Sequence, residues 1–220
     1  MTDLKETHKR GARMINATRV LAISAHTDDV EFWASGFVMK NIDNFDIRHI
    51  VFSTAEESIP DEFEKDSTHN EFIAAQKFMG INNYELYDFR VRWFFLHRQD
   101  ILEILVKERN TFKPDLILVP SEEDLHQDHS VIGREASRAF FYNTILQYPT
   151  SRTLENLSIN VICSIPDEIV ERKLKLLEIY RSQIGKNRYI ERIKGIMEFY
   201  GNIYEMKYVE PFHIKKIVMV

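Results

Sequence analysis

Short apolar runs alternate with longer amphipathic segments along most of this chain of 220 residues. Such alternation is typical of βαβ units, in which a helix connects each strand to the next parallel strand. We therefore expect an α/β fold, a Rossmann-like three-layer sandwich with a mostly parallel sheet at its centre. The expected strands cover residues 19–25, 48–54, 83–87, 115–120, 158–164 and 213–219.

Helices are expected between most of these strands. Asp28 and Asp29 suit the N-terminus of the first helix. Gly80 is a suitable C-cap for the second helix, and Pro166 suits the start of the fifth. The expected helices cover residues 29–41, 67–79, 98–110 and 130–146, and a fifth begins near residue 166. Residues 186–212 show no clean period and receive no assignment.

Length and composition predict one domain over residues 1–220. Hydrophobic residues make up 44% and charged residues 29%, and no segment resembles a linker. The net charge of −5 removes the electrostatic reason to expect nucleic-acid binding. The first residues are too polar for a signal peptide, and no apolar run reaches about eighteen residues, so we expect a cytoplasmic protein without membrane insertion.

Two clusters of histidines and carboxylates each follow an expected strand. Ala25-His26-Thr27-Asp28-Asp29 follows the first apolar run, and His126-Gln127-Asp128-His129 lies in the loop after the run that ends at Pro120. The carboxyl ends of parallel strands lie at one edge of a sheet, where such folds bind ligands. Cys163 is the only cysteine, so a metal must bind mainly through His and carboxylates. The clusters together predict one shared metal site.

The residue types in these clusters suit metal-assisted hydrolysis of an amide. Zinc in hydrolytic sites usually takes three protein ligands and a water, and amide hydrolysis also needs a base and an acid. One of the adjacent Asp28 and Asp29 could hold the metal while the other faces its water. Likewise, one of His126 and His129 could ligate while the other acts on the substrate. Asp128 could accept a hydrogen bond from a ring N–H. Spacing alone does not choose between these roles.

Both clusters resemble motifs of the PIG-L/LmbE family of zinc-dependent deacetylases, which remove N-acyl groups from amino sugars and related compounds. The family's A-H-P-D-D-x-E motif is similar to residues 25–31, and its H-P-D-H motif is similar to residues 126–129. Residues 208–212, Tyr-Val-Glu-Pro-Phe, resemble the family's Tyr-Ala-Glu-x-Phe segment. Weaker agreement extends over most of the chain.

The resemblance implies a role for each residue of the clusters. It implies that His26, Asp29 and His129 bind zinc, although a site of two His and one Asp also accepts other divalent ions. It implies that Asp28 is the general base. His126 would stabilise the oxyanion or donate a proton, with Asp128 holding it.

The chain departs from the family pattern at several positions. Thr27 and Gln127 replace prolines of the two motifs. Thr68 stands where the family commonly has a substrate-binding arginine, so we expect that contact from elsewhere, with Arg92 as the candidate. Glu31 is expected to be a first-turn charge that complements the helix dipole. The aromatic residues 93–95 are expected to pack beneath a loop.

We therefore expect a zinc-dependent N-deacetylase. Its substrate would be a small N-acetylated amino sugar, free or carried on a nucleotide or glycoconjugate. Two alternatives stay open: a deacylase of another small N-acyl metabolite, and a catalytically silent metal-binding member of the same fold. A nucleotide-binding module is disfavoured because the chain has no G-x-G-x-x-G turn. Homo-oligomers are common in the family, which leaves a homo-oligomer open.

Overall fold

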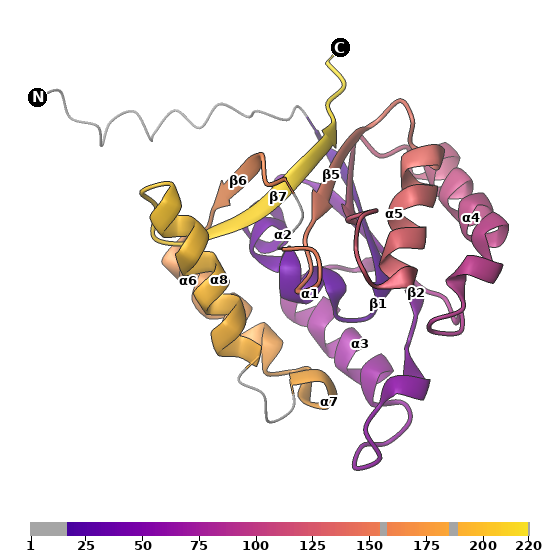
Figure 1. Ribbon diagram of the computed structural model, residues 1–220, viewed down its shortest axis with the longest axis horizontal. Helices are drawn as coiled ribbons and strands as arrows, with labels where there is room; N and C mark the ends of the chain where they lie inside the picture. Colours follow the sequence, from indigo (N-terminus) through magenta and orange to yellow (C-terminus); the bar gives the residue numbers. More distant parts are fainter. Residues whose placement is uncertain (1–16, 155–157, 185–188, 220) are drawn as a thin grey trace, which may run out of the picture.

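The computed structural model describes residues 17–154, 158–184 and 189–219, and these contain a seven-stranded sheet in the order β3-β2-β1-β4-β5-β7-β6 (Figure 1). The five strands from β3 to β5 pair in parallel, whereas β7 is antiparallel to both of its neighbours. The strands are β1 (Arg19–His26), β2 (Asp46–Ser53), β3 (Asn83–Leu86), β4 (Leu116–Pro120), β5 (Thr144–Tyr148), β6 (Val161–Ser164) and β7 (Val209–Lys216). The predicted α/β fold with a mostly parallel sheet is confirmed.

Helices cover both faces of the sheet, which gives the expected three layers (Figure 1). One apolar core lies between the sheet and α4 and α5, and a second lies on the other face with α1, α2, α3, α6 and α8. The α-helices are α1 (Asp29–Trp33), α2 (Ser35–Asn41), α3 (Ser67–Met79), α4 (Arg98–Thr111), α5 (Gln127–Ala139), α6 (Asp167–Leu177), α7 (Arg181–Ile184) and α8 (Tyr189–Ile203). Short 3-10 helices are η2 (Glu56–Ser58) and η3 (Phe94–Leu96).

Three predicted elements differ from the structure. The helix expected over 130–146 begins earlier, at Gln127, and ends at Ala139, so residues 144–148 form the buried strand β5 instead. The helix expected over 29–41 is divided at Ala34, whose φ of −137° leaves the helical region. The final strand begins four residues earlier than expected, at Val209. Residues 189–203, which had no assignment, form α8.

Glu210 on β7 ties the last strand to the start of α2. Its two carboxylate oxygens accept hydrogen bonds from the backbone N–H groups of Gly36 and Phe37, at 2.8 and 2.6 Å. The ammonium of Lys173 on α6 lies 2.5 Å from the same carboxylate. A Cβ at position 36 would lie only 2.6 Å from Glu210 Oε1, so a glycine is needed there. This contact joins three elements beneath the helix that carries the first cluster.

The two clusters meet where the strand order reverses. β1 pairs with β2 on one side and with β4 on the other, and the connections from these two central strands leave in opposite directions. Such a switch point opens a crevice at the carboxyl ends of the strands. Gly133 lets α5 pack closely beside it, because a Cβ there would lie 2.6 Å from the backbone nitrogen of Glu122. The sheet topology therefore places residues 26–29 and 126–129 together.

Candidate metal and catalytic site

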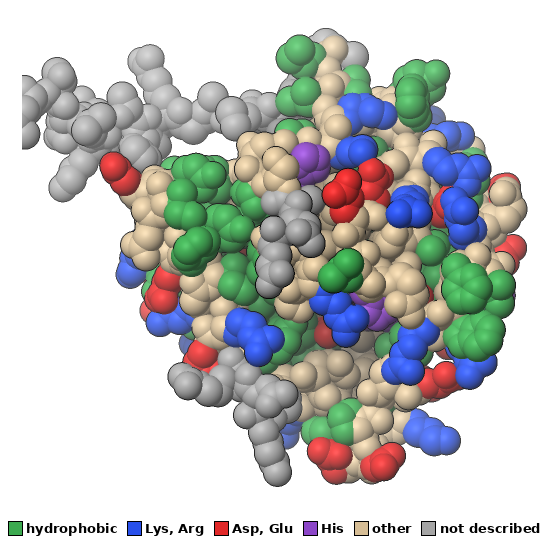
Figure 2. Space-filling model, viewed as in Figure 1, with side chains coloured by type: hydrophobic (Ala, Val, Ile, Leu, Met, Phe, Trp, Pro, Cys, Tyr) green, Lys and Arg blue, Asp and Glu red, His purple; other side chains and the backbone are tan. Residues whose placement is uncertain are grey.

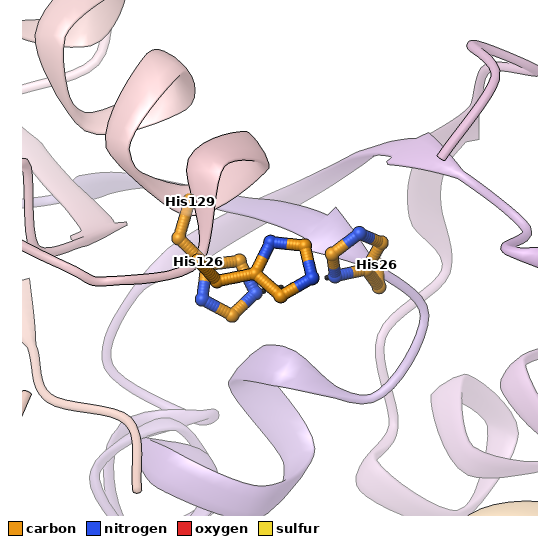
Figure 3. A group of neighbouring side chains, drawn as sticks. All are labelled: His26, His126 and His129. Atoms are coloured by element: carbon orange, nitrogen blue, oxygen red, sulfur yellow. Dashed lines mark hydrogen bonds between the residues drawn. The ribbon is translucent and has the colours of Figure 1, made fainter. Parts of the chain in front are cut away.

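Three histidine rings gather at this switch point (Figure 3). His26 is the last residue of β1, whereas His126 precedes α5 and His129 lies in its first turn. Each ring offers one nitrogen, and the three nitrogens lie within 4.8 Å of one another. Among the residues that the structure describes, this is the group of His, Cys, Asp or Glu with the spacing of a metal site. The geometry therefore confirms the prediction that the two clusters lie together.

Asp29 completes a tighter triangle with two of these rings. His129 Nε2 lies 3.2 Å from His26 Nδ1 and 3.1 Å from Asp29 Oδ1, and the third side, from His26 Nδ1 to Asp29 Oδ1, is 3.9 Å. Tetrahedral zinc with ligands about 2.0–2.2 Å away has neighbouring ligand atoms about 3.3–3.5 Å apart. The other oxygen of Asp29 accepts hydrogen bonds from the backbone N–H groups of Ala25 and His26, which fixes its orientation. These donor atoms fit a metal ion.

Carboxylates outside the triangle hold the His26 and His129 rings. His26 Nε2 lies 3.1 Å from Asp128 Oδ2, and His129 Nδ1 lies 3.0 Å from Asp124 Oδ2. Hydrogen bonds of this kind orient a metal-binding imidazole and raise its basicity. The expectation that Asp128 holds His126 is wrong, because its carboxylate contacts His26 and only its backbone N–H contacts the His126 ring.

Asp124 was absent from the sequence-based site. Its Oδ1 accepts a hydrogen bond from the backbone N–H of His126, and the Thr150 hydroxyl donates at 2.5 Å to Oδ2, the oxygen that contacts His129. The signal in the sequence is a carboxylate two residues before a histidine in a loop that follows a strand.

The electrostatics of the triangle favour a cation. Burial alone would lower the pKa of His26, but Asp128 and Asp29 raise it to about 9. Burial likewise opposes charge on His129, but Asp29 and Asp124 raise its pKa to about 10. Burial would raise the pKa of Asp29, yet His129 and His26 hold it well below its usual range. A pocket that stabilises positive charge on two buried rings also suits a divalent metal.

Asp28 and His126 differ from these groups. Asp28 is half-buried, and burial together with the Asp29 charge raises its pKa to about 6, as in carboxylates that act as general bases near neutral pH. Burial and the neighbouring His129 and His26 lower the pKa of His126 to about 4, so this ring is neutral. Its Nδ1 accepts a hydrogen bond from the backbone N–H of Asp128, which leaves the proton on Nε2.

These residues line a cavity of about 560 Å³. Arg92, the expected substrate contact, is one of its lining residues, together with Thr68 and Tyr189. The remaining lining residues are His26, Thr27, Asp28, Asp29, Phe32, Trp33, Ala55, Ser58, Val91, His126, Gln127, His129, Thr150, Ser151, Arg152 and Gln183.

Behind the first cluster lies a buried polar chain that sequence reasoning did not find. Glu31, expected as a helix-dipole charge, is fully buried and accepts a hydrogen bond from Gln76 Nε2 at 2.6 Å. His49 bonds to Gln76 and to Ser24 at 3.0 and 2.9 Å. The expectation that the aromatic residues 93–95 pack beneath a loop is wrong for Trp93 and Phe95, which are exposed, whereas Phe94 is buried in the core beside α4 and α5. Phe94 contacts the His26 ring.

Solved structures share this fold at low sequence identity. An N,N'-diacetylchitobiose deacetylase from Pyrococcus horikoshii is 20% identical with a TM-score of 0.76, and the match covers 97% of this chain and 93% of that one. A teicoplanin deacetylase, Orf2, solved in a zinc-inhibited form, is 16% identical with a TM-score of 0.70 over 90% and 99%. The 4-carboxy-2-hydroxymuconate hydratase GalB from Pseudomonas putida KT2440 is 14% identical with a TM-score of 0.76 over 92% and 98%.

In the described part of the chain, no helix combines the length and the apolar character needed to cross a lipid bilayer.

A sequence comparison identifies the family. The PIG-L family model, described as GlcNAc-PI de-N-acetylase, matches residues 21–140, which include both histidine and aspartate clusters. The chain therefore belongs to the PIG-L/LmbE family.

Proposed function

We propose that this protein is a zinc-dependent N-deacetylase that removes the acetyl group from an amino sugar or from its nucleotide or glycoconjugate form. The observation that supports this most strongly is the convergence of His26, Asp29 and His129 within 3.1–3.9 Å beside Asp28, a carboxylate outside that triangle. These are a three-ligand set and a separate base, the two parts that metal-assisted amide hydrolysis requires.

His26, Asp29 and His129 would hold the metal in this proposal. When bound, a zinc ion polarises the amide carbonyl and lowers the pKa of a water molecule. Asp128 and Asp124 keep the two rings oriented through their far nitrogens. Because Asp29 Oδ2 accepts two backbone hydrogen bonds, the carboxylate is fixed with Oδ1 directed at the histidines.

Asp28 would carry the proton transfers, and His126 would stabilise the oxyanion. Asp28 takes a proton from the attacking water, for which its raised pKa of about 6 is suited. His126 donates a hydrogen bond from Nε2 to the oxygen that becomes negative in the tetrahedral intermediate. Asp28, which now carries the proton taken from the water, then protonates the departing amine. The C–N bond breaks, and acetate and a free amine leave.

The cavity suits a small polar substrate. Its volume of about 560 Å³ falls within the usual range for small-molecule sites. Hydroxyl and amide groups of Ser58, Thr68 and Gln183 line it beside the rings of Trp33 and Tyr189. Such a mixture of hydrogen-bonding groups and aromatic faces is appropriate for a sugar ring. Because the similar fold of GalB belongs to a protein described as a hydratase, the assay must follow acetate release rather than binding.

The test is acetate and amine release from a panel of N-acetyl amino sugars, their nucleotide conjugates and simple N-acyl amines. We expect the zinc-loaded protein to release equal amounts of both products from at least one N-acetyl sugar. Asp28→Asn should retain its zinc and lose at least about 100-fold in kcat, the usual range for a general base. Asp43→Asn, an exposed carboxylate away from the cavity, is the matched control.

Three outcomes would contradict the proposal in different ways. Full activity in Asp28→Asn would remove Asp28 as the base. Hydrolysis of simple N-acyl amines but of no sugar would favour the other class of substrate. Zinc binding without release of acetate from any member of the panel would favour a catalytically silent protein.

A further inference from the structure

Two arginines from different loops line the cavity together with the histidine group. Arg92 lies in the loop after β3, and Arg152 lies in the loop after β5, whereas the histidines come from the ends of β1 and β4 between them. They are the only Lys or Arg among the described residues that line the cavity, and the carboxylates there are Asp28 and Asp29. The cavity lining therefore includes two carboxylates, Asp28 and Asp29, and two guanidinium groups.

The backbone of Arg92 is held in an unusual conformation. Its φ of +70° lies in the left-handed region, which favours glycine. Its N–H donates a hydrogen bond to Asp128 Oδ2 at 2.6 Å, and its guanidinium donates to the Ser58 hydroxyl at 3.1 Å. Non-glycine residues in such conformations occur where the surroundings fix them, commonly at functional sites.

Arg152 is attached to the site in a parallel way. Its backbone N–H donates to the Thr150 hydroxyl at 3.3 Å, and that hydroxyl donates to Asp124. Asp124 in turn holds His129, as Asp128 holds His26. Arg92 is thus bonded directly to Asp128, and Arg152 is connected to Asp124 through the Thr150 hydroxyl.

Neither guanidinium forms an ion pair with a carboxylate in the described part of the chain. The salt bridges there include Arg90 with Glu57 at 3.0 Å, two residues before Arg92, but none to Arg92 or Arg152. Both side chains are exposed at the cavity. In a chain with a net charge of −5, two guanidinium groups beside one cavity, with no carboxylate partner among the described residues, are a local feature rather than a general basic surface. Figure 2 shows basic and acidic side chains interspersed over this face of the molecule.

We propose that the substrate of this site carries an anionic group, a phosphate or a carboxylate, which Arg92 and Arg152 bind beside the cavity while the acetamide faces His26 and Asp28. The planar guanidinium forms paired, charge-assisted hydrogen bonds with either anion. Asp28 and Asp29 repel an anion, so the charges in the cavity favour the orientation in which the anionic group lies beside the arginines. This inference rests on the proposed function, because it names the class of substrate for that site.

Binding to a catalytically inactive protein tests the inference separately from turnover. The zinc-loaded Asp28→Asn variant is titrated calorimetrically with N-acetylglucosamine, its 1-phosphate, its 6-phosphate and N-acetylmuramic acid, which carries a carboxylate. We expect at least one anionic sugar to bind about tenfold or more tightly than the neutral one. That preference should weaken as NaCl is raised. The phosphate and carboxylate probes identify which anion is bound.

Arginine variants provide the specific readout. Added to Asp28→Asn, Arg92→Gln and Arg152→Gln should each lower affinity for the anionic sugar about tenfold and leave affinity for N-acetylglucosamine unchanged, and together they should abolish the preference. Arg90→Gln, whose parent residue is paired with Glu57, is the matched control and should change neither affinity.

The outcomes separate this inference from the proposed function. Equal affinity for neutral and anionic sugars, or a preference that survives in the double arginine variant, would overturn the inference while acetate release by the parent protein still supported deacetylation. Arginine-dependent binding of an anionic sugar, with no release of acetate by the parent protein, would support the anion site and overturn the proposed function.

Discussion

Asp128 Oδ2 lies 3.1 Å from His26 Nε2, so the aspartate of the second cluster holds the histidine of the first across 102 residues. The same oxygen accepts the backbone N–H of Arg92. One carboxylate therefore links the candidate metal ligand, the start of α5 and the loop after β3. Although Asp128 is not one of the three candidate ligands, we expect a change at this residue to weaken metal binding.

Asp128→Asn should lower zinc affinity about 10- to 100-fold, the usual effect of losing an outer carboxylate behind a ligating histidine. The amide keeps the size of the side chain but removes the charge that makes the His26 ring more basic. Competition with a chromophoric chelator measures the change. Glu123→Gln, an exposed neighbour, should bind zinc as the parent does. Equal affinity in Asp128→Asn would show that the contact with His26 does not support the metal.

Zinc uptake should release protons and should tighten as pH rises. The pKa values of His26 and His129 are raised to about 9 and about 10, so both rings carry a proton at pH 7 before the metal binds. Each must lose it to ligate. Calorimetric titration of chelator-treated protein, in buffers with different ionisation enthalpies, counts these protons. Uptake without proton release at pH 7 would contradict the ligand assignment.

The buried ring of His49 should make the protein less stable in mild acid. Burial lowers its pKa to about 4, compared with about 6.5 in the unfolded chain. Between these values the unfolded state binds a proton that the folded state excludes, so the free energy of unfolding falls as pH drops from about 6.5 to 4. The loss is on the order of 3 kcal/mol.

A matched variant isolates this contribution from those of other titrating groups. His49→Asn keeps a polar side chain toward Ser24 and Gln76 but does not titrate. The difference in urea-unfolding free energy between parent and variant should therefore shrink as pH falls from 6.5 to 4. A difference that does not change with pH in this range would rule out the lowered pKa of His49.

Removing the buried ammonium of Lys173 should destabilise the fold strongly. Lys173 and Glu210 are each 1% exposed, so Lys173→Met leaves a buried carboxylate with only the N–H groups of Gly36 and Phe37. The expected cost is about 3–5 kcal/mol by urea unfolding, because an uncompensated buried charge remains. The exposed Lys175→Met is the control, with an effect within about 0.5 kcal/mol.

The same pair offers a rescue. Adding Glu210→Gln to Lys173→Met removes the uncompensated charge and should recover part of the lost stability. If the double variant is instead less stable by the sum of both single effects, the two residues do not act as a pair.

The sequence alone was enough to predict that two distant clusters meet. The apolar runs before His26 and before His126 are short and continuous, as strands buried on both faces are, and parallel strands end at a common edge. The family resemblance added a choice of ligands, and the triangle of His26, Asp29 and His129 has the spacing for it. Residues 144–148 were misassigned because this buried strand continues the apolar pattern of α5 after only four residues.

Local pattern determined which residue types reach the sheet edge, and the tertiary structure decided which of them touch. The carboxylate of Asp128 contacts His26 rather than the neighbouring His126, and the carboxylate of Asp124 contacts His129. Glu31 is buried against Gln76, although its position indicates only a first-turn charge that complements the helix dipole. These partners come from other strands and helices, and their pairing depends on how β1 packs beside β4 and α3 beneath α1. Sequence periodicity indicates which face of a helix or strand is buried. It does not indicate which side chain of another element contacts that face.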